Sequence, residues 1–253
     1  GIINYTRVCE KLAEVIESRG GKILLHTKVK AIEEKGDEVQ IVTNKSFIEC
    51  KLMVNCAGLY SDDVAKEHLG KIDTKIIPFR GEYYELTAEA EHLVKHLIYP
   101  APDPAFPFLG VHFTRMSEGG IEAGPNAVFA FKKEGYKKTD FKASEFFGSL
   151  LWPGFQKVMM KYWKTGLGEM HRSFSKKAFT KALQRLIPEI KEEHLVAAPA
   201  GVRAQACDRT GGLLDDFKLV TKKRAIHVIN APSPAATSSL SIGKTISEMV
   251  ELD

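Results

Sequence analysis

Cysteine is scarce in this sequence, and long hydrophobic runs are absent. Only four of the 253 residues are cysteine, and none of them forms a C-x-x-C pair; they are Cys9, Cys50, Cys56 and Cys207. This spacing excludes a zinc ribbon and a disulfide-dense secreted scaffold. It indicates reduced, mostly buried thiols in a cytosol-type compartment. No apolar run approaches the roughly 18–20 residues that a membrane-spanning helix needs.

Several short motifs of well-known enzyme classes are missing too. The sequence has no G-x-S-x-G, H-E-x-x-H, Walker or EF-hand pattern, and its only G-x-G, Gly166–Gly168, lacks the third glycine of a dinucleotide fingerprint. His92 and His96 lie one helical turn apart without a third ligand nearby, which favours a solvated helix face over a metal site. The net charge of +4 suits an anionic small molecule, and no basic cluster with interleaved aromatics points to nucleic acid.

The hydrophobic pattern that is present predicts an α/β fold with an α+β insert. The first part reads as a helix, a short buried strand, a three-strand meander, and a buried strand that meets a glycine turn and a helix. The expected ranges are 4–19 for the first helix, 22–26 for the strand, 28–50 for the meander, 51–56 for the buried strand and 61 onwards for the second helix.

After Gly70 the pattern changes to long strands and then to helices. We expect strands over 76–86, 109–116 and 120–124, a Pro-rich loop over 99–104, and helices within 140–187 broken at Trp152–Gly154 and near Gly166–Gly168. The end returns to the α/β pattern, with strands over 199–207 and 225–230 and a last helix over 234–250 that Ser233 caps. This predicts a division into 1–75, 76–198 and 199–253, in which the first and last parts form one domain.

Three segments have the residue types of a ligand site. Val54–Ser61 follows a strand with small residues, which lets a backbone approach something flat or phosphate-bearing. Arg203 follows Gly201 on an otherwise apolar strand, where it forms either a structural ion pair or a carboxylate clamp. Asn230–Thr237 is a small-residue turn that runs into a helix, whose free N–H groups suit an anion or a carbonyl-rich ring.

Together these segments resemble the D-amino-acid-oxidase-like flavoprotein family, over essentially the whole chain. Asn55–Gly58, Pro78–Tyr83 and Gly201–Arg203 carry the general likeness. Leu97–Arg115, Ala123–Val128, Pro199–Gln205 and Asn230–Thr237 resemble the branch that oxidises L-2-hydroxyglutarate. The family's opening strand–G-x-G-x-x-G–helix unit does not occur here, so we expect the chain to be the C-terminal part of a longer protein.

The resemblance implies that L-2-hydroxyglutarate is oxidised to 2-oxoglutarate by hydride transfer from C2 to N5 of FAD. His112 would be the base, Arg203 would bind one carboxylate, and Arg80 or Arg115 would bind the other. Tyr99 and Tyr83 would donate hydrogen bonds to the substrate. Each of these residues also has a purely structural alternative. His112 would be a strand histidine with its hydrogen bonds satisfied, the arginines would lie at the surface or in ion pairs, and the tyrosines would belong to the core.

The resemblance also implies the cofactor contacts. Val29 would lie against the adenine end through its backbone, and Ala57 and Gly58 near the ribityl or pyrophosphate region. The N1/O2 edge of the flavin would face the start of the last helix, where a positive dipole end stabilises reduced flavin. The residues expected there are Ser233, Pro234, Ala235, Ala236 and Thr237, although Ser233 and Pro234 would equally well just begin a helix.

Two other functions compete with this one. A sister flavoprotein would oxidise a small amino acid or glycerol phosphate, and a non-catalytic domain would bind a dicarboxylate or a partner without flavin. The enzyme would need an electron acceptor, either a quinone, an electron-transfer protein or oxygen. The expected location is the cytoplasm, and the composition is compatible with peripheral contact to the cytoplasmic face of a membrane.

Overall fold

The computed structural model describes residues 1–101, 110–222 and 224–250, which belong to two compact units. The insert unit comprises Gly1–Asn4 and Ile77–Leu213, and the terminal unit comprises Tyr5–Ile76 and Leu214–Asp253. Both combine helices with sheets, so the predicted mixed α/β class is confirmed. Half of the expected Pro-rich loop, residues 102–104, lies outside the described residues.

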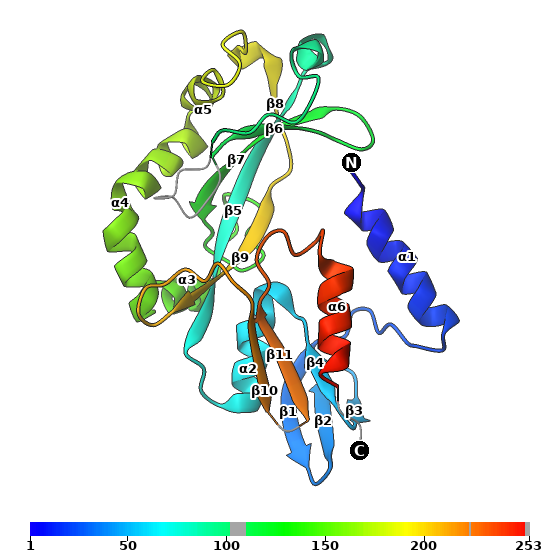
Figure 1. Ribbon diagram of the computed structural model, residues 1–253. Coiled ribbons are helices and arrows are strands. Elements are labelled where there is room, and N and C mark those ends of the chain that lie inside the picture. The colour runs from blue at the N-terminus through cyan, green and yellow to red at the C-terminus, as the bar shows by residue number, and fades with distance from the viewer. Residues whose placement is uncertain (102–109, 223, 251–253) are drawn as a thin grey trace. The chain divides into compact units, whose positions relative to one another are not determined.

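The terminal unit contains two three-stranded sheets and three helices (Figure 1). The predicted meander forms an antiparallel sheet of β1 (Val29–Lys35), β2 (Glu38–Thr43) and β3 (Phe47–Cys50). The second sheet has the order β10 (Lys218–Lys222), β11 (Ala225–Asn230) and β4 (Met53–Asn55), with β11 parallel to β4. The helices are α1 (Tyr5–Ser18), α2 (Ser61–Leu69) and α6 (Ser239–Glu248).

Strand β11 is the most deeply buried element of the terminal unit, since all six of its residues are buried. Ala225 packs with Ile32, Val39 and Met53, and the neighbouring cluster joins Ile226 and Val228 to Ile246 of α6. Helix α2 contacts both β1 and β11. Strand β4 pairs with this buried strand, so the turn that follows β4 begins from a packed core.

The insert unit is built on a five-stranded sheet whose long central strand is β5 (Thr74–Leu86) (Figure 1). The order is β6 (His112–Arg115), β7 (Ile121–Phe129), β5 and β8 (Leu195–Ala197), and β9 (Gly201–Asp208) also pairs with β5. Three helices follow β7, namely α3 (Ala143–Leu150), α4 (Pro153–Phe174) and α5 (Lys176–Leu183). Helix α4 packs on β7 and β9, and Phe179 of α5 belongs to the main core.

One predicted element is wrong, and one is displaced. Residues 22–26 form no strand, and Leu24 and Leu25 are 55% and 69% exposed, because the described chain offers this segment no strand to pair with. Gly166–Gly168 lie inside α4, and the interruption expected near them falls four residues earlier, at a kink at Tyr162 (φ −111°, ψ 19°). Packing of α4 on the sheet outweighs the cost of about 1 kcal/mol for each interior glycine.

The four cysteines are free thiols. The prediction that they are mostly buried is wrong for Cys9 and Cys56, which are exposed, and only Cys207 is fully buried. Cys9 is exposed because α1 has no buried residue, and Cys56 lies in the open turn that follows β4.

Candidate functional site

Four polar residues of the insert unit converge from separate elements of its sheet. His112 begins β6, Tyr83 lies on β5 and Arg203 lies on β9. An antiparallel bridge between Ile98 and Phe113 brings the neighbouring Tyr99 beside His112, and the two ring centroids are 4.5 Å apart. Arg203 hydrogen-bonds the Tyr83 phenol, which joins the four side chains into one cluster.

A glycine on β7 makes room for this cluster. Gly124 pairs with His112 and has a φ of 151°. A Cβ at this position would lie 2.8 Å from Cδ1 of Tyr83 and 2.8 Å from the carbonyl oxygen of Glu82. The close approach of β7 to Tyr83 therefore requires glycine.

Burial and charge set the protonation of the cluster. Burial lowers the pKa of His112, and the Arg203 charge lowers this pKa further, although the Gly110 hydrogen bond opposes both. Nδ1 of His112 lies 2.9 Å from the Gly110 carbonyl oxygen, which only accepts, so Nδ1 carries the proton of the neutral ring. The lone pair is then on Nε2. Burial raises the pKa of Tyr83, which stays a neutral phenol near pH 7.

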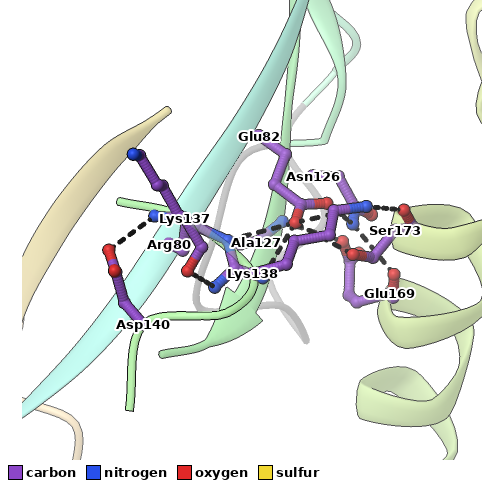
Figure 2. A network of polar contacts seen from close by, with 9 residues as sticks. All are labelled: Arg80, Glu82, Asn126, Ala127, Lys137, Lys138, Asp140, Glu169 and Ser173. Atoms are coloured by element: carbon purple, nitrogen blue, oxygen red, sulfur yellow. Dashed lines mark hydrogen bonds and ion pairs between the residues drawn. The ribbon is translucent and has the colours of Figure 1, made fainter. Parts of the chain in front are cut away.

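Arg80 and Arg115 are engaged elsewhere. Arg80 is 6% exposed and donates from Nε and Nη2 to Oε1 of Glu82, at 3.1 and 2.9 Å (Figure 2). Nη1 of Arg115 donates to the Val94 carbonyl at 2.8 Å. Because side chains alternate along a strand, Arg115 points to the face of β6 opposite His112. The structure thus gathers Arg203, His112 and Tyr99 but does not bring these two arginines to them.

Figure 2 shows the network that holds Arg80. Glu82 also accepts from Ser173 at 2.9 Å, while Asn126 donates to the Glu169 carbonyl at 2.8 Å. A cavity of about 290 Å³ opens beside it, and its lining includes Arg80, Tyr83 and the Ala197–Ala200 segment. Arg80 therefore reaches a cavity, but its charge is already neutralised by Glu82.

In the terminal unit, Asn55 fixes the turn expected to contact the cofactor. Its Oδ1 accepts from the Ala57 N–H at 3.1 Å, and its Nδ2 donates to the Ser61 carbonyl at 2.9 Å. Gly58 has a φ of 55° and open space where a Cβ would be. Ala57 and Gly58 are both exposed. The turn consists of small exposed residues and is fixed by the Asn55 hydrogen bonds, which fits the close approach of a flat or phosphate-bearing group.

A buried chain of hydrogen bonds continues from Asn55. Its Nδ2 also faces Nδ1 of His227 at 3.1 Å, Nε2 of His227 faces Nδ1 of His68 at 3.0 Å, and Nε2 of His68 faces Glu34 Oε1 at 3.1 Å. Because Asn55 uses Oδ1 for the Ala57 N–H, its Nδ2 must donate to His227, which fixes both rings as neutral Nε2–H tautomers. Sequence reasoning missed His227, His68 and Glu34, since no spacing connects them.

The segment before α6 differs from its prediction. The last helix begins at Ser239 with Ser238 as its N-cap, so Ser233 does not cap it and no helix dipole begins at Pro234. Pro232 and Pro234 lack N–H groups, and tight turns form instead, with the Ala235 N–H donating to the Pro232 carbonyl at 2.9 Å. Ser233, Pro234, Ala236 and Thr237 are nevertheless exposed, and the Thr237 hydroxyl lies 3.0 Å from that of Tyr5.

Val29 begins β1, pairs with Thr43 and is 36% exposed. Val29, Ala57, Gly58 and the 233–237 segment all belong to the terminal unit, whereas the His112 cluster belongs to the insert unit. Each unit thus carries one of the two predicted groups of site residues.

Comparisons with known proteins match this chain along nearly its full length. The family described as FAD dependent oxidoreductase matches residues 1–249. Among curated relatives, L-2-hydroxyglutarate dehydrogenase of Indibacter alkaliphilus is 61% identical over 249 residues, covering 98% of this chain and 62% of that protein. The enzyme of the same name from Escherichia coli K12 is 43% identical, covering 99% and 60%. The chain spans about 60% of the length of these relatives.

Solved structures share the fold at low identity. L-α-glycerophosphate oxidase of Mycoplasma pneumoniae, with FAD bound, has a TM-score of 0.66 at 19% identity and covers 92% of this chain and 52% of that one. Glycine oxidase of Geobacillus kaustophilus has a TM-score of 0.54 at 14% identity and covers 95% and 53%.

Proposed function

Because the chain belongs to the FAD-dependent oxidoreductase family, we propose that it is part of an enzyme that oxidises L-2-hydroxyglutarate to 2-oxoglutarate. The observation that carries the proposal is the His112 cluster, in which a neutral imidazole with its lone pair on Nε2 shares a site with Arg203. A 2-hydroxy acid needs these two groups, a base for its hydroxyl and a cation for its carboxylate. The 61% identity to a relative named for this activity supports the substrate.

In the proposed mechanism the insert unit binds and orients the substrate. Arg203 receives one carboxylate, and the Tyr83 phenol donates a further hydrogen bond beside it. His112 takes the hydroxyl proton on Nε2, and the tilted Tyr99 ring, 4.5 Å away between centroids, packs against the imidazole. The predicted partners of the second carboxylate, Arg80 and Arg115, lie outside this cluster and are held by Glu82 and by the Val94 carbonyl, so either would have to leave its present partner to bind substrate.

The cofactor, when bound, supplies the two-electron acceptor for the hydride that leaves C2. Val29, Ala57, Gly58 and the 233–237 segment of the terminal unit would hold it. Their small size and exposure, together with the Asn55 clamp on Ala57, fit that role. The proposal includes an electron acceptor, either a quinone, an electron-transfer protein or oxygen, and peripheral contact with a membrane. In the described part of the chain, no helix is long and apolar enough to cross a bilayer.

Anaerobic reduction of the flavin in the full-length enzyme tests this function. We expect L-2-hydroxyglutarate to bleach the oxidised flavin absorbance, and D-2-hydroxyglutarate to leave it unchanged. Glycine and glycerol 3-phosphate serve as the substrates of the sister functions. Reduction by either of these without reduction by L-2-hydroxyglutarate would replace the proposed substrate, and a protein that binds no flavin would favour the non-catalytic alternative.

A further inference from the structure

The outer face of α4 carries a row of large apolar side chains. Met160, Trp163, Leu167 and Phe174 are 70%, 56%, 61% and 75% exposed. Trp163, Leu167 and Phe174 follow the kink at Tyr162, and their spacings of four and seven residues are those of a single helix face, while Met160 lies on the turn before the kink. We call these four residues the α4 ridge.

The ridge is not the face by which α4 packs in the fold. That face is formed by residues such as Phe155 and Val158, which are 2% and 6% exposed and join the core with Ile77 and Cys207. Helix α4 therefore has two apolar faces, and only one of them is covered within the described chain. A solvated helix normally presents charged and polar side chains on its outer face.

Positive charge flanks the ridge. Lys157, Lys161 and Lys164 are exposed at helical spacing next to the apolar row, and Nζ of Lys164 lies 5.6 Å from the centroid of the Trp163 ring. The only acidic residue of α4 is Glu169, which is turned inward to the Ala127 N–H and to Arg172. No carboxylate of α4 therefore balances the lysines.

We propose that the α4 ridge docks this protein onto an anionic membrane surface, with α4 lying in the plane of the interface. Apolar residues that include tryptophan, edged by lysines, are the features by which a helix binds at the boundary of headgroups and acyl chains. The proposal assigns a surface to the membrane contact included in the proposed function and does not depend on the substrate.

Charge complementarity favours this occupant over a protein. Lysine is depleted in protein–protein interfaces. A second copy of the chain packed ridge to ridge would also bring the lysines of two α4 helices together, and their charges would repel. Anionic headgroups instead attract the lysines while the acyl boundary accepts the ridge.

Vesicle co-sedimentation of the full-length enzyme tests the proposal. We expect binding to phosphatidylcholine vesicles that contain phosphatidylserine, weak binding to pure phosphatidylcholine vesicles, and release by salt. Trp163→Gln with Leu167→Gln should abolish binding. Replacing Lys157, Lys161 and Lys164 by Gln should weaken it by on the order of a hundredfold. Leu240→Gln with Lys244→Gln is the matched control, since Leu240 is 71% exposed on a different helix, α6, and the pair removes one apolar side chain and one lysine.

Three further readouts separate the outcomes. Circular dichroism and flavin reduction should be unchanged in the ridge variant, which distinguishes docking from folding and from the proposed reaction. Trp163 emission should shift to shorter wavelength when vesicles are added. The proposal would be overturned if the wild-type enzyme did not bind vesicles, or if the ridge variant bound them equally well. It would also be overturned if the wild type formed a dimer that only the ridge variant disrupts, since the ridge would then be a contact between copies.

Discussion

At His112 a backbone carbonyl decides which ring nitrogen can act as a base. The Gly110 oxygen takes the Nδ1 proton, so the neutral ring has its lone pair on Nε2. Burial and the Arg203 charge both lower the pKa of His112, which keeps the ring neutral around pH 7. Sequence alone identified His112 as a candidate, but neither the tautomer nor the contact with the Tyr99 ring follows from its position in the chain.

His112→Gln should slow flavin reduction by L-2-hydroxyglutarate by about 100- to 10,000-fold, because no base then accepts the hydroxyl proton. The base works only when unprotonated. Since its pKa is lowered from 6.5, the wild-type rate should stay on its plateau below pH 6.5 and fall only at more acidic pH. Stopped-flow reduction across pH measures both effects.

His92→Gln is the control for His112→Gln. Nδ1 of His92 also lies against a backbone carbonyl, that of Glu89 at 2.7 Å, but His92 lies outside the cluster. Its replacement should leave the rate and the pH profile unchanged. A normal rate in His112→Gln would assign His112 to the structure of β6 rather than to the reaction.

Arg203→Lys should weaken L-2-hydroxyglutarate binding by roughly 10- to 100-fold, because lysine cannot make the two parallel hydrogen bonds of a guanidinium to a carboxylate. Flavin content should not change. Substrate affinity from the concentration dependence of flavin reduction is the measurement. Arg115→Lys is the companion variant. If it leaves the affinity for L-2-hydroxyglutarate unchanged, Arg115 serves only its bond to the Val94 carbonyl. If Arg203→Lys leaves that affinity unchanged, Arg203 is structural.

At the scale of elements, the sequence predicts a helix or strand best where residues close in the chain specify it. The meander of β1, β2 and β3 follows from alternation and from turns at Gly36–Asp37 and Asn44–Lys45. The apolar run 22–26 failed as a strand because pairing depends on a neighbour that no local signal specifies. The helix break expected near Gly166–Gly168 is displaced to the kink at Tyr162, because the packing of α4 on β7 and β9 is a tertiary property.

The Asn55–His227–His68–Glu34 chain makes the terminal unit sensitive to acid. Burial lowers the pKa of His227 to about 4, and the neighbouring His68 contributes in the same direction. Because the folded pKa lies below the ordinary value of 6.5, this stability is complete above pH 6.5 and is lost as the pH falls towards 4. We expect a loss of up to roughly 3 kcal/mol from this residue, measured by urea unfolding at pH 7 and pH 4.5.

His227→Gln tests the origin of that loss. A glutamine keeps an amide N–H near the position of Nε2 but does not titrate, so the variant should be less stable at pH 7 and should lose less stability on acidification. Replacement of exposed His92 by Gln should leave the pH dependence as in the wild type. If His227→Gln keeps the full acid sensitivity, other groups cause it.

At the scale of the molecule, the candidate sites are assembled from residues that are distant in sequence. Tyr83 and Arg203 are joined only because β9 pairs with β5, and Asn55 meets His227 only because β11 pairs with β4. The family resemblance indicated Tyr83, Arg203 and Asn55 individually, but not His227. Their partners depend on strand order, which no local pattern encodes, and so Gly124, His68 and Glu34 were not predicted.

Helix α1 presents an exposed apolar face of its own. None of its residues is buried, and Leu12, Val15 and Ile16 are 39%, 38% and 48% exposed on one face. A contiguous apolar face of this kind binds other apolar surfaces in water. We therefore expect these 253 residues, expressed alone, to self-associate in a concentration-dependent way, measured by sedimentation velocity. Leu12→Gln with Ile16→Gln should shift the chain towards monomer, whereas Leu240→Gln in α6, which removes a similar exposed side chain elsewhere, should not. A monomer at all concentrations would show that the α1 face is covered within the chain itself.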